Sequence, residues 1–372
     1  MRPIARDDTS IMGRWWWTVD HWTLCSFALL TAFGLVLTVA ASPPVAERIG
    51  LDPLHFVRNQ AILIGPALAM MISVSLLDPR SIRRVGAIAF AGVIVLLGLT
   101  LLIGPEIKGA TRWLSIAGFS LQPSEFVKPT FAIVAAWMFS ARRLGEDVPG
   151  YLISGILYLL VMGLLLAQPD VGQAIVVSAI WFTQWFLAGL SIAWVAVLGT
   201  AGVAAMVGAY FFFPHVASRI DRFLDPASGD SYQIDRAMEA FLNGGLLGRG
   251  AGEGVAKAYL PDAHADFIFA VAGEEFGLVA CFLIIALFVF IILRSLFRVL
   301  EANDLFIMLA ATGLVVQFAL QAIINMASTV NLMPTKGMTL PFISYGGSSL
   351  LALGFGMGML LALTRSRPGG HT

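Results

Sequence analysis

Residues 242–277 read LNGGLLGRGAGEGVAKAYLPDAHADFIFAVAGEEFG and run directly into an apolar segment that ends near residue 293. The stretch concentrates glycines and ionisable side chains in a chain that is 58% hydrophobic and only 12% charged. Its ionisable residues are Arg249, Glu253, Lys257, Asp262, His264, Asp266, Glu274 and Glu275. Removing charged groups from water at a membrane boundary is costly, so the cluster indicates a functional site beside a membrane-spanning segment.

The composition of the whole chain predicts a membrane protein. Mean hydropathy is +0.84, and the charged fraction is about half that of a soluble domain. Several apolar runs reach about 18–20 residues, which is enough to cross a hydrocarbon core of about 30 Å. Lipid cannot satisfy backbone N–H and C=O groups, so continuous runs of this length favour helices. We therefore expect an all-α polytopic membrane protein.

Charge and cysteine content argue against other classes of protein. The formal net charge is zero, which gives no electrostatic case for binding nucleic acid. Cys25 and Cys281 fall within apolar runs, where we expect small buried thiols rather than a disulfide or metal framework. The sequence calls for no cofactor.

Ten segments have the composition of membrane spans. They lie near residues 22–41, 58–77, 83–103, 123–140, 150–167, 171–187, 190–212, 267–293, 304–329 and 348–364. We expect one integral-membrane domain over 1–372, with cytoplasmic tails at 1–21 and 365–372. A long outer loop, 213–266, would join spans seven and eight. The first span is long enough to stay as an uncleaved helix, although Ala40-Ala41-Ser42 leaves a cleaved signal peptide as the alternative.

Lysine and arginine residues in short loops predict the orientation of these spans. With both termini inside, the cytoplasmic side receives twelve of them: Arg2, Arg6, Arg14, Arg80, Arg83, Arg84, Arg142, Arg143, Arg294, Arg298, Arg365 and Arg367. The short outer loops receive five: Arg48, Arg58, Lys108, Arg112 and Lys336. The polar, glycine-rich loops then share the outer side, where we expect the active or binding face.

Within loop 213–266, the spacing of apolar residues predicts a short helix over 232–242, followed by a stop at Asn243-Gly244-Gly245. This helix would lie either at the membrane interface or on an ordinary surface. The run GRGAGEG at 248–254 resembles a nucleotide-binding loop only superficially, because no strand–loop–helix context surrounds it. We expect its glycines to serve tight bends or close approach to a ligand.

Asp266 begins the eighth span, and two interpretations of it remain open. It is either a helix cap, for which aspartate is well suited, or a functional carboxylate in an outer cavity. His264 either orients the loop or binds a group. Glu274 and Glu275 follow about two helical turns later, and at least one of them must face the protein interior or a cavity rather than lipid.

Further polar residues carry similar alternatives. Glu125 and Lys128 in QPSEFVKP are three residues apart at a helix start and share a face. They form either an internal ion pair or a site for a charged substrate, with Lys128 near phosphate. Asp170 either caps the sixth span or joins the site. Arg112 is suited to phosphate groups near the membrane surface.

Residues 334–349, PTKGMTLPFISYGGSS, form a proline- and glycine-rich segment between the last two spans. Irregular backbone at membrane depth is tolerated only where protein covers it or where it lines a cavity. We therefore expect this segment to fold back over the cavity that contains Asp266. Lys336 and Ser344 would then be candidates for contact with the substrate, Lys336 with its phosphate.

Five motifs together resemble the signature blocks of the SEDS family. They are GRGAGEGVAKAYLPDAHADFIFAVAGEEFG, LMPTKGMTLPFISYGGSS, QPSEFVKP, KGATRW and QPDVGQA, and they span nearly the whole chain. The wording of the long loop resembles the division branch of that family more than its elongation branch. One departure is Ala265, where the family usually has threonine or serine before the aspartate.

The resemblance implies a peptidoglycan glycosyltransferase that polymerises lipid II, an undecaprenyl-pyrophosphate-linked disaccharide pentapeptide, at the outer face of the inner membrane. It implies a class B penicillin-binding protein and other divisome proteins as partners, and action at the division site. The essential aspartate of the family maps onto Asp266. Four residues match other polar positions of the family: Arg112, Glu125, Lys128 and Asp170.

The chemistry of glycan extension suits these residues. The 4-hydroxyl of one sugar attacks the anomeric carbon of the lipid-linked chain, and Asp266 would act as general base. The pyrophosphate leaving group needs charge neutralisation, from Arg112, Lys128, Lys336 or a divalent cation such as Mg²⁺ or Mn²⁺. Direct displacement would invert the configuration at that carbon. A flippase of the lipid-linked precursor, an elongation-type polymerase and a non-catalytic division scaffold remain as alternatives.

Overall fold

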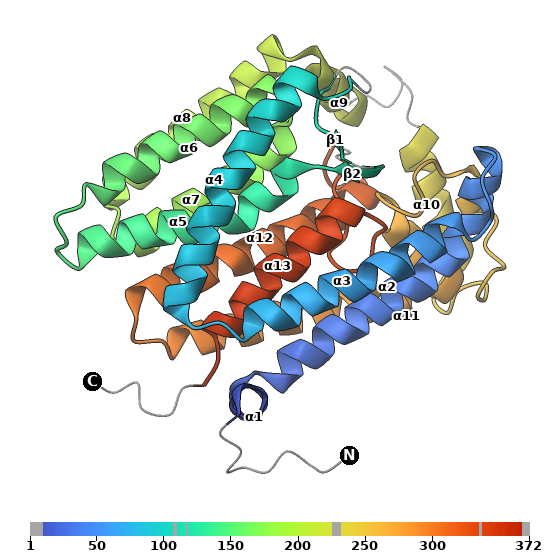
Figure 1. Cartoon of the computed structure of the whole chain (residues 1–372). Coiled ribbons are helices and arrows are strands. Elements are labelled where there is room, and N and C mark those ends of the chain that lie inside the picture. The colour runs from blue at the N-terminus through green and yellow to red at the C-terminus, as the bar shows by residue number, and fades with distance from the viewer. Residues whose placement is uncertain (1–9, 107–109, 117, 225–231, 335–336, 367–372) are drawn as a thin grey trace.

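The computed structural model describes residues 10–106, 110–116, 118–224, 232–334 and 337–366 of the chain. Apart from one small hairpin, its regular elements are helices (Figure 1). The helices that fall on the ten predicted spans are α2 (His21–Arg48), α3 (His55–Ser75), α4 (Pro79–Ile103), α5 (Pro123–Arg143), α6 (Gly150–Ala167), α7 (Val171–Leu187), α8 (Ile192–Phe212), α11 (Ile268–Leu300), α12 (Leu305–Thr329) and α13 (Gly347–Leu363). The prediction of helices at these positions is confirmed.

Seven helices in the described part are long and apolar enough to cross a membrane: α2, α3, α4, α6, α8, α11 and α12. Two more, α7 and α13, are apolar but shorter. The chain is therefore a mostly helical protein with several candidate membrane spans.

The centre of the molecule is formed by α5, α12 and α13, whose side chains are largely buried. Helices α2, α3 and α11 lie along one side of this centre, and α4, α6 and α8 lie along the other (Figure 1). Two glycines allow α13 to approach α3 closely. A Cβ atom at Gly354 would lie 2.5 Å from the Ala67 carbonyl oxygen, and one at Gly358 would lie 2.7 Å from that of Met71. Small residues four apart are a common means of bringing membrane helices together.

Helix α8 differs from the others because none of its residues is buried. It is apolar on all sides, as a helix surrounded by lipid would be. After it the chain continues through α9 (Pro214–Leu224), and α10 (Tyr232–Gly244) leads toward α11.

Helix α1 (Ile11–Thr18) and the C-terminal end of α13 lie at the same end of the helix bundle (Figure 1), where the Ser366 N–H donates to the Thr18 carbonyl at 3.0 Å. Asp20, just before α2, receives a two-pronged hydrogen bond from the Arg294 guanidinium of α11, with N–O distances of 2.7 to 3.0 Å. Burial by itself raises the pKa of Asp20, but hydrogen bonds from Arg294 and Thr23 outweigh it and hold the pKa below its usual value. Nearby, Arg365 donates to the backbone carbonyls of Ser75 and Leu76.

Several local elements differ from the sequence-based expectations. The predicted helix at 232–242 is confirmed as α10, but α9 and the short 3-10 helix η2 (Ala256–Tyr259) were not expected. Neither was α1 (Ile11–Thr18), nor the hairpin of β1 (Leu114–Ile116) and β2 (Phe119–Leu121). The expectation of two buried thiols is wrong for Cys25, which is exposed, and confirmed for Cys281. A helix with one lipid-facing side can carry a small apolar thiol on that side at little cost.

Candidate functional site

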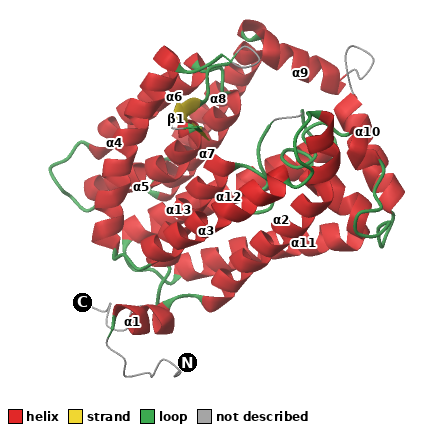
Figure 2. Cartoon of the chain, turned by 45° about the vertical axis from the view of Figure 1, so that its right-hand side comes forward, coloured by secondary structure: helices red, strands yellow, loops and turns green. Residues whose placement is uncertain are grey.

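Three segments far apart in the sequence meet at Asp266. The turn at 261–267 precedes α11, and the loop before α13 folds back onto it. Ser344 Oγ donates to the Ala265 carbonyl at 2.6 Å, and the Tyr345 backbone N–H donates to the His264 carbonyl at 2.9 Å. The expected return of the 334–349 segment to Asp266 is thus present. Figure 2 shows this region as loops on the side of the bundle away from α1.

Asp266 is partly exposed and does not occupy the cap position of α11. The N-cap position of α11 is Phe267, whose side chain makes no capping hydrogen bond. The Asp266 backbone carbonyl accepts a hydrogen bond of 2.9 Å from Asn325 Nδ2. The same amide group donates to the Met338 carbonyl at 2.6 Å. Asn325 therefore fixes Asp266 and the C-terminal loop to α12 at one point.

Gly337 lies directly against the Asp266 carboxylate. A Cβ atom at this glycine would be 3.0 Å from Asp266 Oδ2. Only a residue without a side chain therefore leaves the carboxylate its present space. The adjacent Lys336, a predicted phosphate ligand, lies outside the described residues.

His264 is buried beside Asp266 with only 7% of its surface exposed. Its ring stacks on Phe56, with centroids 3.9 Å apart and planes 22° apart. Within the described part of the chain, Nδ1 is buried without a hydrogen-bond partner. Burial lowers the pKa of His264 to about 4, an effect that Asp262 opposes and Arg48 reinforces. His264 is therefore neutral at physiological pH.

Glu125 and Lys128 form an ion pair inside the protein. The Lys128 Nζ atom lies 2.9 Å from Glu125 Oε2, and the two side chains are 1% and 9% exposed. Lys128 also donates to Gln321 Oε1 at 3.1 Å, while Gln173 Nε2 donates to Glu125 Oε1 at 2.6 Å. This geometry matches the internal ion pair of the two alternatives, because both charges are already compensated by protein groups.

Arg112 and Asp170 lie next to that pair. The Arg112 guanidinium is 3.9 Å from Asp170 Oδ1 and donates to the carbonyls of Gln168 and Pro169. Asp170 caps α7 through the Gln173 N–H at 3.5 Å and receives Ser124 Oγ at the same distance. About a quarter of the Arg112 side chain is exposed, 28%, so it keeps access to an anionic group.

A polar face of α12 joins the two groups of predicted site residues. Gln321 Nε2 donates to the Thr339 carbonyl, Thr339 Oγ1 and Ser349 Oγ, each at 3.2 Å, while its oxygen accepts from Lys128. Asn325 lies one helical turn further along and holds Asp266. Sequence reasoning missed Gln321 and Asn325. The missed signal is the row Gln317, Gln321, Asn325 and Thr329, which repeats every four residues within an apolar span.

Metal binding by protein groups alone has little support in the described residues, where no three His, Cys, Asp or Glu side chains are grouped. Magnesium often binds through one or two carboxylates together with substrate phosphates and water. A partly exposed aspartate such as Asp266 is the kind of residue that this second mode uses. The predicted divalent cation therefore stays a prediction.

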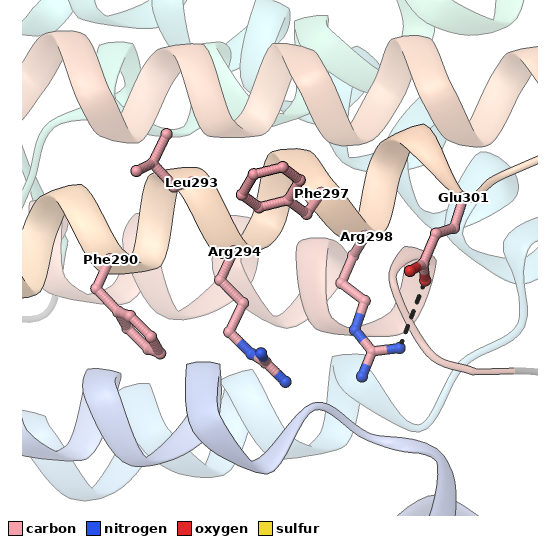
Figure 3. Close-up of a pocket in the computed structure, with 6 residues that line it drawn as sticks. All are labelled: Phe290, Leu293, Arg294, Phe297, Arg298 and Glu301. Atoms are coloured by element: carbon pink, nitrogen blue, oxygen red, sulfur yellow. Dashed lines mark ion pairs between the residues drawn. The ribbon is translucent and has the colours of Figure 1, made fainter.

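A pocket of about 520 Å³ lies at the far end of α11 (Figure 3). Its lining residues are Phe290, Leu293, Arg294, Phe297, Arg298 and Glu301. Arg294 is already bound to Asp20, and Arg298 pairs with Glu301 at 3.8 Å, so the charges of this pocket are compensated. Asp266 is separated from it by most of the length of α11, and we do not include the pocket in the site.

The chain resembles known proteins over nearly its whole length. The FtsW/RodA/SpoVE family model, described as cell cycle protein, matches residues 20–368. A probable peptidoglycan glycosyltransferase FtsW from Caulobacter vibrioides is 46% identical over 369 residues, covering 99% of this chain and 95% of the relative. The protein of the same description from Escherichia coli O157:H7 is 34% identical, covering 90% of this chain and 83% of the relative.

Solved structures share the fold. A chain from a peptidoglycan synthase complex that coordinates polymerisation and crosslinking superimposes with a TM-score of 0.77 at 26% identity, covering 93% of this chain and 97% of the other. The rod shape determining protein RodA of Thermus thermophilus gives a TM-score of 0.66 at 26% identity, covering 93% and 96%. The chain belongs to the FtsW/RodA/SpoVE family of cell cycle proteins, the SEDS family, and within it is FtsW-like.

Proposed function

We propose that this protein is a peptidoglycan glycosyltransferase that polymerises lipid II into glycan strands, with Asp266 as the general base. The observation that carries the proposal is the placement of Asp266. This partly exposed residue lies where α11, α12 and the loop before α13 meet, and its backbone carbonyl is fixed by Asn325. Two relatives that match 99% and 90% of this chain are named as probable peptidoglycan glycosyltransferases.

The proposed reaction uses this carboxylate to remove a proton. Asp266 accepts the proton of the sugar 4-hydroxyl as its oxygen attacks the anomeric carbon of the lipid-linked chain. The bond from that carbon to the pyrophosphate oxygen breaks, and the configuration at the carbon inverts. Arg112 stabilises the departing anion, since its guanidinium keeps access to solvent. Lys336 is a second candidate for this role.

Glu125 and Lys128 contribute differently in this proposal. Their charges compensate each other inside the protein, and Lys128 reaches Gln321 rather than an open surface. We assign them to holding α5 and α12 together below the site. A Mg²⁺ or Mn²⁺ ion, if the reaction uses one, would be held by Asp266 and would neutralise the pyrophosphate.

The proposed arrangement in the cell follows from the charge distribution. All ten predicted spans cross the inner membrane as a single domain, with both termini cytoplasmic and loop 213–266 periplasmic. The larger number of Lys and Arg residues in the inner loops supports this orientation. Helix α1 and the end of α13 lie at one end of the bundle, which supports an even number of spans (Figure 1). A division-site location is proposed from the resemblance of the long loop to the division branch of the family.

The proposed partners are a class B penicillin-binding protein, which crosslinks the glycan, and other divisome proteins. The similar chain from a peptidoglycan synthase complex works where polymerisation and crosslinking are coordinated. If the partner raises activity, the isolated protein should polymerise lipid II at a lower rate than the complex.

A single assay separates polymerase from flippase. Purified protein, with and without the penicillin-binding partner, is incubated with lipid II, and the products are separated by size on a gel. We expect glycan strands, at a higher yield with the partner present. Translocation of lipid II across vesicles without any polymer, under both conditions, would contradict the proposal and favour the flippase.

A further inference from the structure

The first turns of α11 carry two adjacent carboxylates that are completely buried, Glu274 and Glu275. Their position in a span suggests contacts with neighbouring helices, but both carboxylates bind the preceding loop. Glu274 instead accepts three backbone N–H groups from the preceding loop, from Val255 at 2.7 Å, Ala256 at 2.7 Å and Lys257 at 2.9 Å. These groups belong to the start of η2, so Glu274 acts as its cap from another part of the chain.

The carboxylate of Glu275 binds the same loop. It accepts backbone N–H groups from Gly252 and Gly254, the latter at 3.2 Å, and it binds the Lys257 ammonium group. Lys257 is itself buried, with 7% of its side chain exposed. A carboxylate that receives several charge-assisted hydrogen bonds in a dry environment is held strongly, and removal of one partner is costly.

The backbone makes a second connection at the same place. Leu278 and Val279 direct their N–H groups to the carbonyls of Gly245 and Leu246 at 3.0 and 3.2 Å, instead of continuing the helix ladder. In return the N–H groups of Arg249 and Gly250 donate to the carbonyls of Glu274 and Glu275, each at 3.0 Å. The loop therefore takes the place of one turn in the hydrogen-bond ladder of α11.

Two glycines make this exchange possible. Gly277 has φ 75° inside α11, a left-handed conformation that favours glycine, and a Cβ there would lie 2.3 Å from the Leu246 carbonyl. Gly254 lies between the two carboxylates, where a Cβ would be 2.7 Å from Glu275 Oε1 and 2.9 Å from Glu274 Oε2. The connection thus requires these particular residues on both the helix and the loop.

We propose that Glu274, Glu275 and Lys257 form a clamp that positions Asp266 for the reaction, an inference that rests on the proposed function. The clamp fixes residues 245–257 to α11, and only a short segment then leads to Asp266 at the start of the same helix. Both ends of this segment are therefore attached to one rigid element. The clamp residues do not touch substrate, and they act by fixing the backbone that carries the general base.

This role predicts a particular kinetic defect. In Glu274→Gln the side-chain amide keeps one accepting oxygen. Its NH₂ group takes the place of the other oxygen and faces a backbone N–H donor, so part of the hydrogen bonding to the start of η2 is lost. We expect kcat to fall about tenfold or more, with KM for lipid II changed less than about twofold, since an ångström-scale misplacement affects the chemical step. Glu275→Gln should behave similarly. Glu253→Gln is the matched control, because Glu253 is exposed in the same loop, and it should keep wild-type values.

The coupling between Glu275 and Lys257 provides a test that simple loss of stability would not reproduce. Lys257→Met alone leaves a buried carboxylate without its cation, and kcat should fall as in Glu275→Gln. The double variant Glu275→Gln, Lys257→Met removes both charges. Its kcat should be at least threefold higher than that of Lys257→Met alone. Full-length proteins are compared with the penicillin-binding partner present, and hydrogen exchange follows the amides of residues 255–257.

The outcomes separate the clamp from the proposed function. Wild-type kcat in Glu274→Gln and Glu275→Gln, with Asp266→Asn inactive, would overturn the clamp alone. A raised KM with unchanged kcat would overturn it as well, by assigning the loop to substrate binding. Failure of the wild type to make polymer would overturn the proposed function first. If the glutamine variants do not fold, Gly254→Ala tests the clamp instead, because its methyl group displaces both carboxylates without removing charge. Its kcat should fall while KM changes little, and a wild-type kcat would overturn the clamp.

Hydrogen exchange gives an independent test. Rapid exchange of the 255–257 amides in the wild type would contradict the clamp directly.

Discussion

At the scale of single residues, the surroundings of Asp266 explain how one aspartate is positioned for chemistry. The residue is partly exposed, and its backbone carbonyl is held by Asn325. Two buried cations of the polar region, Lys128 and Lys257, are paired with Glu125 and Glu275. A general base must be held within reach of the proton that it removes.

The space around this carboxylate depends on Gly337. Replacement by alanine would place a methyl group 3.0 Å from Asp266 Oδ2, so either the carboxylate or the loop must move. We expect Gly337→Ala to lower the polymerisation rate about five- to tenfold, because reacting groups tolerate little displacement. Rates are measured with purified protein, partner and lipid II.

Gly92→Ala is a suitable control for this substitution, because nothing lies within 4 Å of a Cβ at that position in α4. It should leave the rate unchanged. A wild-type rate in Gly337→Ala would mean that the position of the Asp266 carboxylate does not limit the reaction.

His264 gives the stability of the protein a particular pH dependence. The pKa of His264 in the folded protein is about 4, below the value of 6.5 for an unfolded chain. The unfolded state therefore gains a proton first as the pH falls. The stability contributed by neutral His264 is complete above pH 6.5 and is lost as the pH falls toward 4, by up to roughly 3 kcal/mol.

The substitution His264→Phe removes this titration while keeping a ring that can stack on Phe56. We expect the apparent Tm of the wild type to fall more steeply than that of His264→Phe between pH 6.5 and 4.5. Thermal unfolding in detergent at several pH values measures both slopes. Parallel curves would show that His264 is not buried in its neutral form.

At the scale of elements, the helices follow directly from apolar runs and are correctly predicted from the sequence. Each run is long enough to be recognised without knowledge of its neighbours, and the lipid environment leaves few alternatives to a helix. The connection between loop 245–257 and α11 could not be predicted in this way. It depends on an exchange of backbone hydrogen bonds between segments about 30 residues apart, which leaves no periodic pattern. A glycine such as Gly277 indicates that another segment approaches the helix closely, but it does not identify that segment.

The packing of α13 on α3 offers a test at this scale. A Cβ at Gly354 would lie 2.5 Å from the Ala67 carbonyl, which belongs to the rigid backbone of α3. We expect Gly354→Ala to destabilise the protein by about 1–3 kcal/mol, as overpacking of a close contact does. The apparent Tm should fall accordingly.

Gly155→Ala in α6 is the control, since a Cβ there meets nothing within 4 Å. Alanine is the better helix former, so the control should be neutral or slightly stabilising. Equal Tm values for Gly354→Ala and the wild type would contradict the close approach of α13 to α3.

At the scale of the whole molecule, a buried polar network connects the site to the interior of the bundle. It runs from Arg112 and Asp170 through Glu125 and Lys128 to Gln321, and from there to the loop beside Asp266. Sequence patterns identified most of its charged members, because charges in apolar runs are conspicuous. They predicted the Glu125–Lys128 pair as one of two alternatives, but they did not identify the amides of α12 or the contact of Arg112 with Asp170, because those contacts depend on segments distant in sequence. The network explains how a mostly apolar bundle supports an irregular loop at its surface.

The most direct test of the central claim compares Asp266→Asn with Asp262→Asn in lipid II polymerisation with the partner present. Asp262 is an exposed residue of the same turn with φ 53°, a conformation that asparagine tolerates, so its variant controls for the loss of one negative charge. We predict that Asp266→Asn folds and inserts normally but forms no glycan strands above background, whereas Asp262→Asn polymerises at nearly the wild-type rate. Glycan strands from Asp266→Asn at a comparable rate would contradict the assignment of Asp266 as the general base.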